Sequence, residues 1–368
     1  MRLALFMATS GHSGVDRIVR NLVPVFTALD IDVDLLKVRG HGPELNSLPN
    51  GARVIDLGSS HVYGSLGAVV RYLRAERPTA MLSDKDRVNR IALLARDIAG
   101  VQTRIAVRTG TTVSVDLRDR GWLDRRIHYL SMHYRYPRAQ AIIVPSEGAA
   151  DDLADFAGLP RQGISVIANP VIDPGLRAQA AEALTHPWFQ ADSPPVVVGA
   201  GELCERKDFE TLLRAFAQAR GERPLRLVLL GRGKRRERLR AMADALGVGE
   251  DVDLPGFVAN PHPYIARASL FVLSSRYEGF GNVLAEALAV GTPVVSTDCP
   301  SGPREILQGG RIGPLVPVGD SEAMAAAITR TLDAPPAKAA LCAAAVPYEA
   351  ERSGRRYLEV LGLRSEST

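Results

Sequence analysis

The fold is decided by one stretch of the sequence, Arg276-Tyr277-Glu278-Gly279-Phe280-Gly281-Asn282-Val283-Leu284-Ala285-Glu286-Ala287-Leu288-Ala289. The apolar residues 270–273 before it suit a buried strand of a parallel sheet. Gly279 and Gly281 allow a tight turn close to a ligand, and Asn282 can cap or begin the helix that follows. That helix is expected to end at Gly-Thr-Pro, residues 291–293. The stretch therefore predicts a strand, a glycine-bearing loop and a helix N-terminus.

Such a junction suits an anion that is flanked by hydroxyl groups. Backbone N–H groups and the positive end of the helix dipole favour a phosphate there. Glu278 and Glu286 lie on either side of the helix start, and an ionised carboxylate accepts hydrogen bonds from hydroxyls. The pattern predicts a nucleoside diphosphate sugar as ligand. The alternative is an ordinary strand–helix junction with solvated acids, but Glu286 lies among Ala and Leu, where an unpartnered carboxylate is unfavourable.

Residues 278–295 closely resemble the E-x7-E motif of the retaining glycosyltransferases of family four. The resemblance covers nearly the whole chain and is strongest from Val196 to Pro317. It implies an α/β fold of the GT-B type, in which two Rossmann-like domains face each other across a cleft. It also implies a bacterial enzyme of polysaccharide biosynthesis. Such an enzyme moves a sugar with retention of configuration, and UDP is the expected nucleotide.

Length and composition fit a cytoplasmic enzyme of two domains. The 368 residues are too many for one compact core. Three scattered cysteines, Cys204, Cys299 and Cys342, indicate a reducing compartment. Residues 2–8 read as a first strand rather than a signal peptide, and no apolar run is long enough to span a membrane. No Asp-x-Asp site is convincingly placed, so we expect neither a metal nor another cofactor.

The domain boundaries follow from composition and from the resemblance. Residues 1–170 are expected as a Rossmann-like, acceptor-side domain, and residues 171–194, rich in Ala and Pro, as a linker. Residues 195–346 are expected as a Rossmann-like nucleotide-sugar domain. By the resemblance, residues 347–368 return to the first domain.

The resemblance assigns the chemistry to three residues of the second domain. Relatives carry Gly-Arg-Leu followed by a Lys, and here Lys207 matches that Lys, while Glu202 stands where the Arg is expected. Arg206 is expected to supply the missing cation, because a guanidinium makes paired bonds to phosphate. Lys207 and Arg206 would then neutralise the diphosphate, and Glu278 would bind the sugar hydroxyls.

Further donor contacts are expected around these three residues. Glu286 is expected to bind the ribose. The residues expected to line the nucleotide and the sugar, many of them through backbone groups, are Gly231, Phe257, Gly279, Phe280, Gly281, Asn282 and Val283.

In the first domain, a loop after the first predicted strand resembles the Gly-Gly-x-Glu-Arg loop of relatives. Gly14 matches its second glycine, and Asp16-Arg17 replaces Glu-Arg. The resemblance places this loop near the donor phosphate and the acceptor. His12 in the same loop is interpreted as a loop residue rather than as a catalyst.

Two further positions of the first domain are site candidates. Asp84 follows the predicted strand 80–82, at the edge where ligands gather in open α/β sheets, together with Ser83, Lys85 and Asn89. Helix capping explains Ser83 or Asp84 equally well. Arg108 occupies the approximate place of a histidine that many relatives carry, and we expect it to face a phosphate or an anionic acceptor.

The excess positive charge of the chain lies in its first half, with six arginines between Arg118 and Arg138. Residues 122–137 are both aromatic and basic, and the helix expected there has two interpretations. It either docks on an anionic membrane surface or packs on the domain with its arginines in water. A nucleic-acid partner is disfavoured, because acids are interleaved with the arginines and no recognition module is present.

Two rival functions share these features. A sugar-nucleotide epimerase has the same two-domain architecture, and it would convert the donor alone. A non-catalytic nucleotide-sugar binding protein is favoured by Glu202 and by the absence of the usual histidine near Arg108. The main prediction remains that the protein transfers the sugar to an acceptor, which is a glycan, a lipid-linked molecule or a small molecule.

Overall fold

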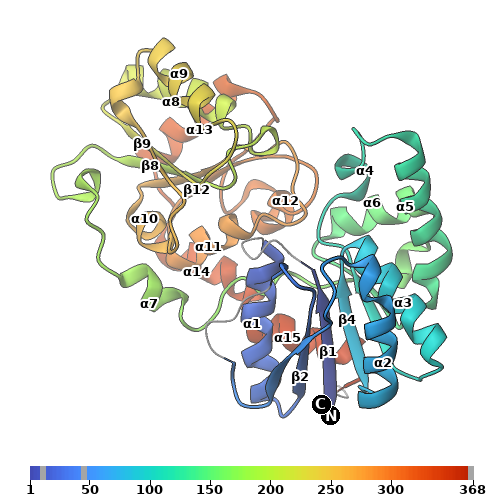
Figure 1. Ribbon diagram of the computed structural model, residues 1–368. Coiled ribbons are helices and arrows are strands. Elements are labelled where there is room, and N and C mark those ends of the chain that lie inside the picture. The colour runs from blue at the N-terminus through green and yellow to red at the C-terminus, as the bar shows by residue number, and fades with distance from the viewer. Residues whose placement is uncertain (9–13, 43–47, 364–368) are drawn as a thin grey trace. The chain divides into compact units, whose positions relative to one another are not determined.

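The computed structural model describes residues 1–8, 14–42 and 48–363. The chain forms two compact units, and each is an α/β unit built on a parallel sheet (Figure 1). The first unit comprises the residues up to Val171 and those from Tyr348 onward, and the second comprises Ile172–Pro347. Within the described ranges, no helix is both long and apolar enough to cross a bilayer.

The first unit contains a parallel sheet of seven strands in the order β3-β2-β1-β4-β5-β6-β7. The order reverses between β1 and β4, which is where ligands bind in open sheets of this kind. Its strands and main helices are β1 Arg2–Met7, α1 Gly14–Ala28, β2 Asp32–Lys37, β3 Ala52–Asp56, α2 Leu66–Glu76, β4 Ala80–Asp84, α3 Asp86–Ala99, β5 Arg104–Arg108, α4 Val113–Asp116, α5 Trp122–Arg135, β6 Ala141–Val144, α6 Glu147–Ala157, β7 Ile164–Val166 and α15 Ala350–Val360.

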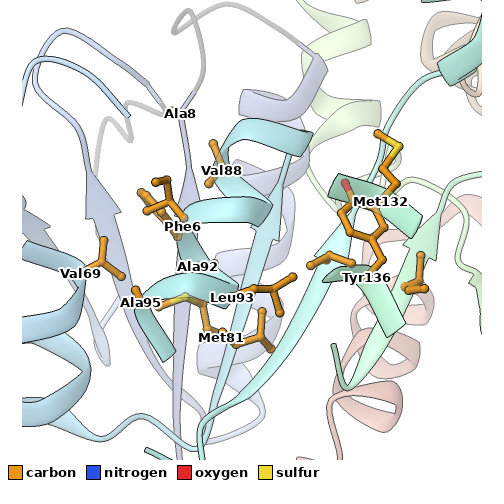
Figure 2. Close-up of a cluster of buried hydrophobic side chains, with 14 of the residues drawn as sticks. Phe6, Ala8, Val69, Met81, Val88, Ala92, Leu93, Ala95, Met132 and Tyr136 are labelled. Carbon is orange, nitrogen blue, oxygen red and sulfur yellow. The ribbon is translucent and has the colours of Figure 1, made fainter. Parts of the chain in front are cut away.

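Both faces of this sheet are covered by helices, because the side chains of each buried strand alternate between two apolar layers. In β1, Phe6 packs in one layer with α2 and α3, and Leu5 packs in the other with α1 and α15. Figure 2 shows part of the first layer, where Phe6 and Met81 meet side chains of α3. The core of this unit therefore includes a helix that arrives from residues 350–360.

The second unit contains a parallel sheet of six strands in the order β10-β9-β8-β11-β12-β13. The order reverses between β8 and β11. Its strands and main helices are α7 Leu176–Ala181, β8 Val196–Ala200, α8 Phe209–Glu222, β9 Arg226–Leu230, α9 Arg236–Ala245, β10 Val252–Gly256, α10 His262–Arg267, β11 Leu270–Leu273, α11 Asn282–Val290, β12 Val294–Thr297, α12 Pro303–Ile306, β13 Leu315–Val316, α13 Ser321–Asp333 and α14 Lys338–Ala345.

The segment expected as a linker has structure of its own. Residues 172–194 belong to the second unit, and their helix α7 packs against α10. Asn260 fixes this contact, since its Nδ2 donates to the backbone oxygen of Gln179 at 2.9 Å. The second unit therefore begins within the Ala- and Pro-rich segment.

The chain leaves and re-enters the first unit at adjacent points. The Val171 amide donates to the Tyr348 carbonyl at 3.1 Å. Asn21 of α1 donates to the Pro170 carbonyl at 2.7 Å, and Ser353 of α15 donates to the Ala168 carbonyl at 2.9 Å. The segment Ala168–Val171 is thus held by two helices of the first unit.

Candidate functional site

The signature stretch lies at the reversal point of the second sheet. β11 ends at Leu273, a loop follows, and α11 begins at Asn282. Gly281 caps this helix with a left-handed φ of 98°, and Asn282 is the first residue of the helix, which is the second of the two places expected for it. Gly302 supports the loop from the other side, because an added Cβ would lie only 1.9 Å from the Phe280 carbonyl oxygen. The turn depends on backbone contact that side chains would prevent.

Glu278 lies in this loop between two cations. Its Oε1 is 2.5 Å from Lys207 Nζ, and its Oε2 is 3.1 Å from Arg206 Nη1. The Ser275 hydroxyl donates to the same Oε1 at 2.7 Å. Glu278 is 6% exposed and Lys207 is 9% exposed, which contradicts the alternative of a solvated junction acid. The structure therefore brings together the three residues to which the resemblance assigns the chemistry.

The electrostatics keep Glu278 ionised despite its burial. Burial by itself would raise the pKa of Glu278, but the neighbouring Lys207 and Arg206 charges and the Lys207 and Ser275 hydrogen bonds lower it below the ordinary glutamate value. The Arg206 pKa is raised, because the Glu278 charge outweighs its desolvation. Two cations face one carboxylate, so the cluster keeps a net positive charge that can attract an anion.

The position of the cations is set by backbone contacts between neighbouring strands. Arg206 and Lys207 lie in a short turn after β8, and β8 pairs with β11 in the sheet. The Ser274 hydroxyl donates to the Lys207 carbonyl at 2.7 Å, and the Arg276 amide donates to the Arg206 carbonyl at 2.8 Å. Hydrogen bonds therefore link the turn that carries Arg206 and Lys207 to the segment that leads into the Glu278 loop.

Glu286, the second acid of the signature, is fully buried in α11. His262 of α10 lies beside it, with Nε2 3.3 Å from Glu286 Oε2. The other ring nitrogen of His262, Nδ1, is 3.0 Å from Gln179 Oε1 of α7. His262 has no local signal in the sequence, because α10 reaches Glu286 only through tertiary packing on α11. In this structure the Glu286 carboxylate faces a histidine rather than open solvent.

The glycine loop after β9 requires glycine at both ends. At Gly231, where φ is 142°, an added Cβ would lie 1.8 Å from the Gly201 carbonyl oxygen. At Gly233, an added Cβ would lie 2.3 Å from the Leu203 carbonyl oxygen. The loop therefore packs backbone against backbone beside the turn that leads to Arg206 and Lys207. This close packing is a physical reason for the Gly-x-Gly pattern.

Phe257 follows β10 and is 54% exposed. The Arg232 guanidinium lies 5.2 Å from the centre of the Phe257 ring, within the range of a cation–π contact. Arg232 belongs to the glycine loop described above and was not singled out from the sequence. The pair presents a flat aromatic and cationic surface at the carboxyl ends of β9 and β10.

In the first unit, the structure contradicts the expectation that Arg108 faces a phosphate or an acceptor. Arg108 and Asp84 are each 1% exposed and form an ion pair at 2.8 Å. Arg108 also donates to the Tyr357 hydroxyl at 3.0 Å and to Asn169 Oδ1 at 2.6 Å. A Cβ on Gly110 would lie 2.9 Å from an Arg108 nitrogen. These internal partners make Asp84 and Arg108 structural residues in this structure.

The residues near Asp84 do not cap α3, so that interpretation is wrong as well. Ser83 donates to Asn89 Oδ1 at 2.8 Å, and Asn89 donates to the Arg108 carbonyl at 3.0 Å. The N-cap of α3 is Lys85, which makes no capping bond and has a φ of 73°. Gly14 begins α1, whereas His12 and the rest of its loop, residues 9–13, lie outside the described residues.

No group of three or more His, Cys, Asp or Glu side chains that could hold a metal ion is found in the part of the chain that the structure describes. Cys204, Cys299 and Cys342 are free thiols. Burial raises the pKa of the Cys299 thiol to about 12, so this thiol is protonated at neutral pH.

Comparisons with known proteins find glycosyltransferase relatives. Residues 13–170 match the model of the glycosyl transferase 4-like domain, and residues 194–334 match that of glycosyl transferases group 1. The chain is 28% identical over 341 residues to the N-acetylgalactosamine-N,N'-diacetylbacillosaminyl-diphospho-undecaprenol 4-alpha-N-acetylgalactosaminyltransferase of Campylobacter jejuni, with 88% of each chain covered. It is 37% identical over 193 residues to the lipopolysaccharide core biosynthesis glycosyltransferase LpsE of Rhizobium meliloti, covering 52% of this chain and 54% of that one.

Solved structures share the fold. The apo form of the lipopolysaccharide outer core galactosyltransferase WaaB matches with a TM-score of 0.73 at 18% identity, over 99% of both chains. Anabaena HepE in complex with UDP matches with a TM-score of 0.77 at 17% identity, over 99% of this chain and 100% of that one. The prediction of two α/β units of the GT-B type is confirmed.

Proposed function

Since the chain belongs to the glycosyltransferases of the group 1 type, we propose that it moves a sugar from a nucleoside diphosphate sugar to an acceptor with retention of configuration. The observation that carries this proposal is the burial of Glu278 between Lys207 and Arg206, beside the N-terminus of α11. Carboxylate, cations and helix terminus converge where a sugar hydroxyl and a diphosphate would be bound together.

In this proposal the cations stabilise the charge of the leaving group. Lys207 and Arg206 would bind the diphosphate oxygens and stabilise the negative charge that grows as the glycosidic bond breaks. Glu278, kept ionised by the same cations, would accept hydrogen bonds from hydroxyls of the transferred sugar. Two fixed cations supply the electrostatic stabilisation that a metal ion supplies elsewhere, so we propose that the reaction needs no metal.

The nucleotide would extend from this cluster toward Glu286 and Phe257. His262 lies beside Glu286 on the side of α10, and the Glu286 carboxylate would accept a ribose hydroxyl once a ligand is bound. The Phe257 ring and the Arg232 guanidinium would contact the base through their flat faces. UDP is the proposed nucleotide, supported by the fold-level match to HepE with UDP.

The proposed acceptor is a glycan carried on a lipid. The names of the relatives from Campylobacter jejuni and Rhizobium meliloti refer to a diphospho-undecaprenol acceptor and to the lipopolysaccharide core. The reaction would then take place at the cytoplasmic face of a membrane. The free thiols Cys204, Cys299 and Cys342 are consistent with a reducing compartment.

The test is a measurement of UDP release and of product structure with a panel of UDP sugars. Glu278→Gln and Lys207→Met are each expected to lower the turnover by a factor of about 100 to 1,000, the usual effect of removing one charge-stabilising group. Glu205→Gln is the matched control, since this neighbouring glutamate pairs with Arg235 at the surface and should leave the rate unchanged. NMR should show retention of configuration, and EDTA should not slow the reaction.

The rivals predict different products. If the donor alone gives an epimerised nucleotide sugar, the protein is an epimerase and the proposed transfer is wrong. Tight binding of UDP sugars without transfer or hydrolysis would instead favour a binding protein. Inversion of configuration in the product would remove the retaining mechanism and leave the transferase assignment standing.

A further inference from the structure

Helix α5 has an inner face whose partners are complete. Met132 and, just beyond the helix, Tyr136 pack into the first apolar layer, as Figure 2 shows. The Ser131 hydroxyl donates to Asp86 Oδ1 at 2.9 Å, and the Tyr136 hydroxyl accepts from Asn89 Nδ2 at 2.9 Å. These contacts fix the rotation of α5 about its own axis. They also determine which side chains it turns outward.

The outward side of α5 is apolar where a surface helix is normally polar. Leu123, Ile127, Leu130 and Tyr134 recur with spacings of four, three and four residues, so they form one stripe along the helix. Trp122 stands at the start of the helix beside this stripe. We call these five residues the α5 outer face, and their exposed fractions are Trp122 78%, Leu123 58%, Ile127 42%, Leu130 38% and Tyr134 66%.

Cations accompany this face. Residues 118–135 contain five arginines and two aspartates. Arg125 and Arg126 are exposed, and neither forms an ion pair with any residue that the structure describes. The Arg126 guanidinium lies 5.4 Å from the centre of the Tyr129 ring, which leaves its charge at the surface. An apolar stripe beside unpaired arginines has the chemistry of a helix that lies in the headgroup region of an anionic membrane.

We propose that the α5 outer face docks on an anionic phospholipid membrane. The stripe would lie at the boundary between headgroups and acyl chains, and the arginines would contact lipid phosphates. Trp122 and Tyr134 suit this boundary because each joins an apolar ring to a polar group. A second copy is a poorer partner, because pairing two identical faces about a twofold axis would bring their arginines together. Docking goes beyond the proposed function, since it needs neither donor nor transfer.

The first experiment is flotation of the purified chain with vesicles of phosphatidylcholine, alone or with one third phosphatidylglycerol. Binding is expected only with the anionic vesicles, and it should weaken as salt is added. Leu123→Glu/Ile127→Glu should lower binding at least tenfold. Its matched control is Ile98→Glu, which changes a residue of α3 that is 47% exposed and should bind as the native chain does.

The charge contribution has its own variant pair. Arg125→Gln/Arg126→Gln should weaken binding by roughly fivefold for each arginine removed. The control Arg352→Gln/Arg355→Gln removes two exposed arginines of α15 and should have little effect. The far-UV circular dichroism spectrum of every variant reports whether the chain is folded, and nucleotide binding is measured separately. A chain that binds vesicles but no nucleotide would refute the proposed function and leave the docking proposal intact.

The second experiment measures the depth of insertion. The sequence has two tryptophans, so Trp188→Phe leaves Trp122 as the single reporter. Brominated acyl chains should quench its fluorescence in anionic vesicles. The proposal is overturned if there is no quenching, or if Leu123→Glu/Ile127→Glu binds vesicles as tightly as the native chain. It is equally overturned if light scattering shows a native dimer that this variant dissociates and vesicles bind neither form, because a second copy would then cover the face.

Discussion

Replacing Glu278 by Gln removes the one negative charge that lies between Lys207 and Arg206. Glutamine keeps the shape, but it leaves two cations facing each other, with Lys207 buried and Arg206 about one third exposed. Breaking a buried ion pair by removing one partner typically lowers the free energy of unfolding by 3–5 kcal/mol, and the partial exposure of Arg206 places this case near the lower end, at about 3 kcal/mol. Urea unfolding followed by tryptophan fluorescence measures this loss.

The same variant should respond more strongly to UDP. In the native chain a diphosphate competes with Glu278 for Lys207 and Arg206, whereas in Glu278→Gln it supplies the missing negative charge. UDP at 100 times its dissociation constant stabilises a protein by about 2.7 kcal/mol. At equal UDP concentration, we expect a larger rise in the unfolding free energy for the variant than for the native chain, although its turnover is lower.

The pH dependence provides an internal check. The pKa of Glu278 is lowered in the folded state, so its contribution to stability is fully present above its unfolded pKa, about 4.5. It is lost as the pH falls through the lower, folded pKa. The difference in stability between the native chain and Glu278→Gln should therefore be constant near neutral pH and shrink only in acid. Equal urea midpoints at pH 7, together with equal responses to UDP, would refute the assigned charge cluster.

Three further predictions test other parts of the structure. His262→Phe removes the polar neighbour of a buried carboxylate, and UDP binding measured by calorimetry should weaken about tenfold, as for other supporting contacts; unchanged affinity would remove His262 from the site. Gly231→Ala places a methyl group against the Gly201 carbonyl. It should lower the thermal midpoint by several degrees, which corresponds to a loss of roughly 2 kcal/mol in the free energy of unfolding. The control Gly100→Ala, which has open space around the added methyl group, should lower the midpoint less. Arg108→Met leaves a buried carboxylate without its cation and should lower the unfolding free energy by about 3–5 kcal/mol in urea; a loss below 1 kcal/mol would show that the ion pair is not needed.

The sequence was most informative where function depends on the ends of neighbouring strands. Glu278 follows β11 and Lys207 follows β8, and these strands are adjacent in the sheet, so strand order alone brings the two residues close. Arg206 could be predicted as the substitute for an expected arginine, because it precedes Lys207 in the same turn. Buried parallel strands leave unbroken apolar runs in the sequence, so individual strands were predictable from the residues. The GT-B type was implied by the resemblance of residues 278–295 to the family motif.

The sequence was least informative about whether a side chain points into the protein or toward solvent. Asp84 and Arg108 end adjacent strands and are partners in the register, so their pairing was readable in principle once β4 and β5 were known to be neighbours. Their inward direction depends on Tyr357, which lies about 250 residues further along the chain and offers no local signal. The contact between His262 and Glu286 is hidden for the same reason, because it arises from the packing of α10 on α11.

The interrupted course of the chain through the first unit has a consequence for its biosynthesis. The second unit is made from one continuous segment, Ile172–Pro347, so it can fold as soon as that segment has left the ribosome. The sheet of the first unit is synthesised earlier, but one of its apolar layers lacks Tyr357 and Leu358 until the segment that follows Pro347 has been made. The first unit is therefore begun before the second unit and completed after it. In the interval its uncovered layer is a natural binding surface for a chaperone.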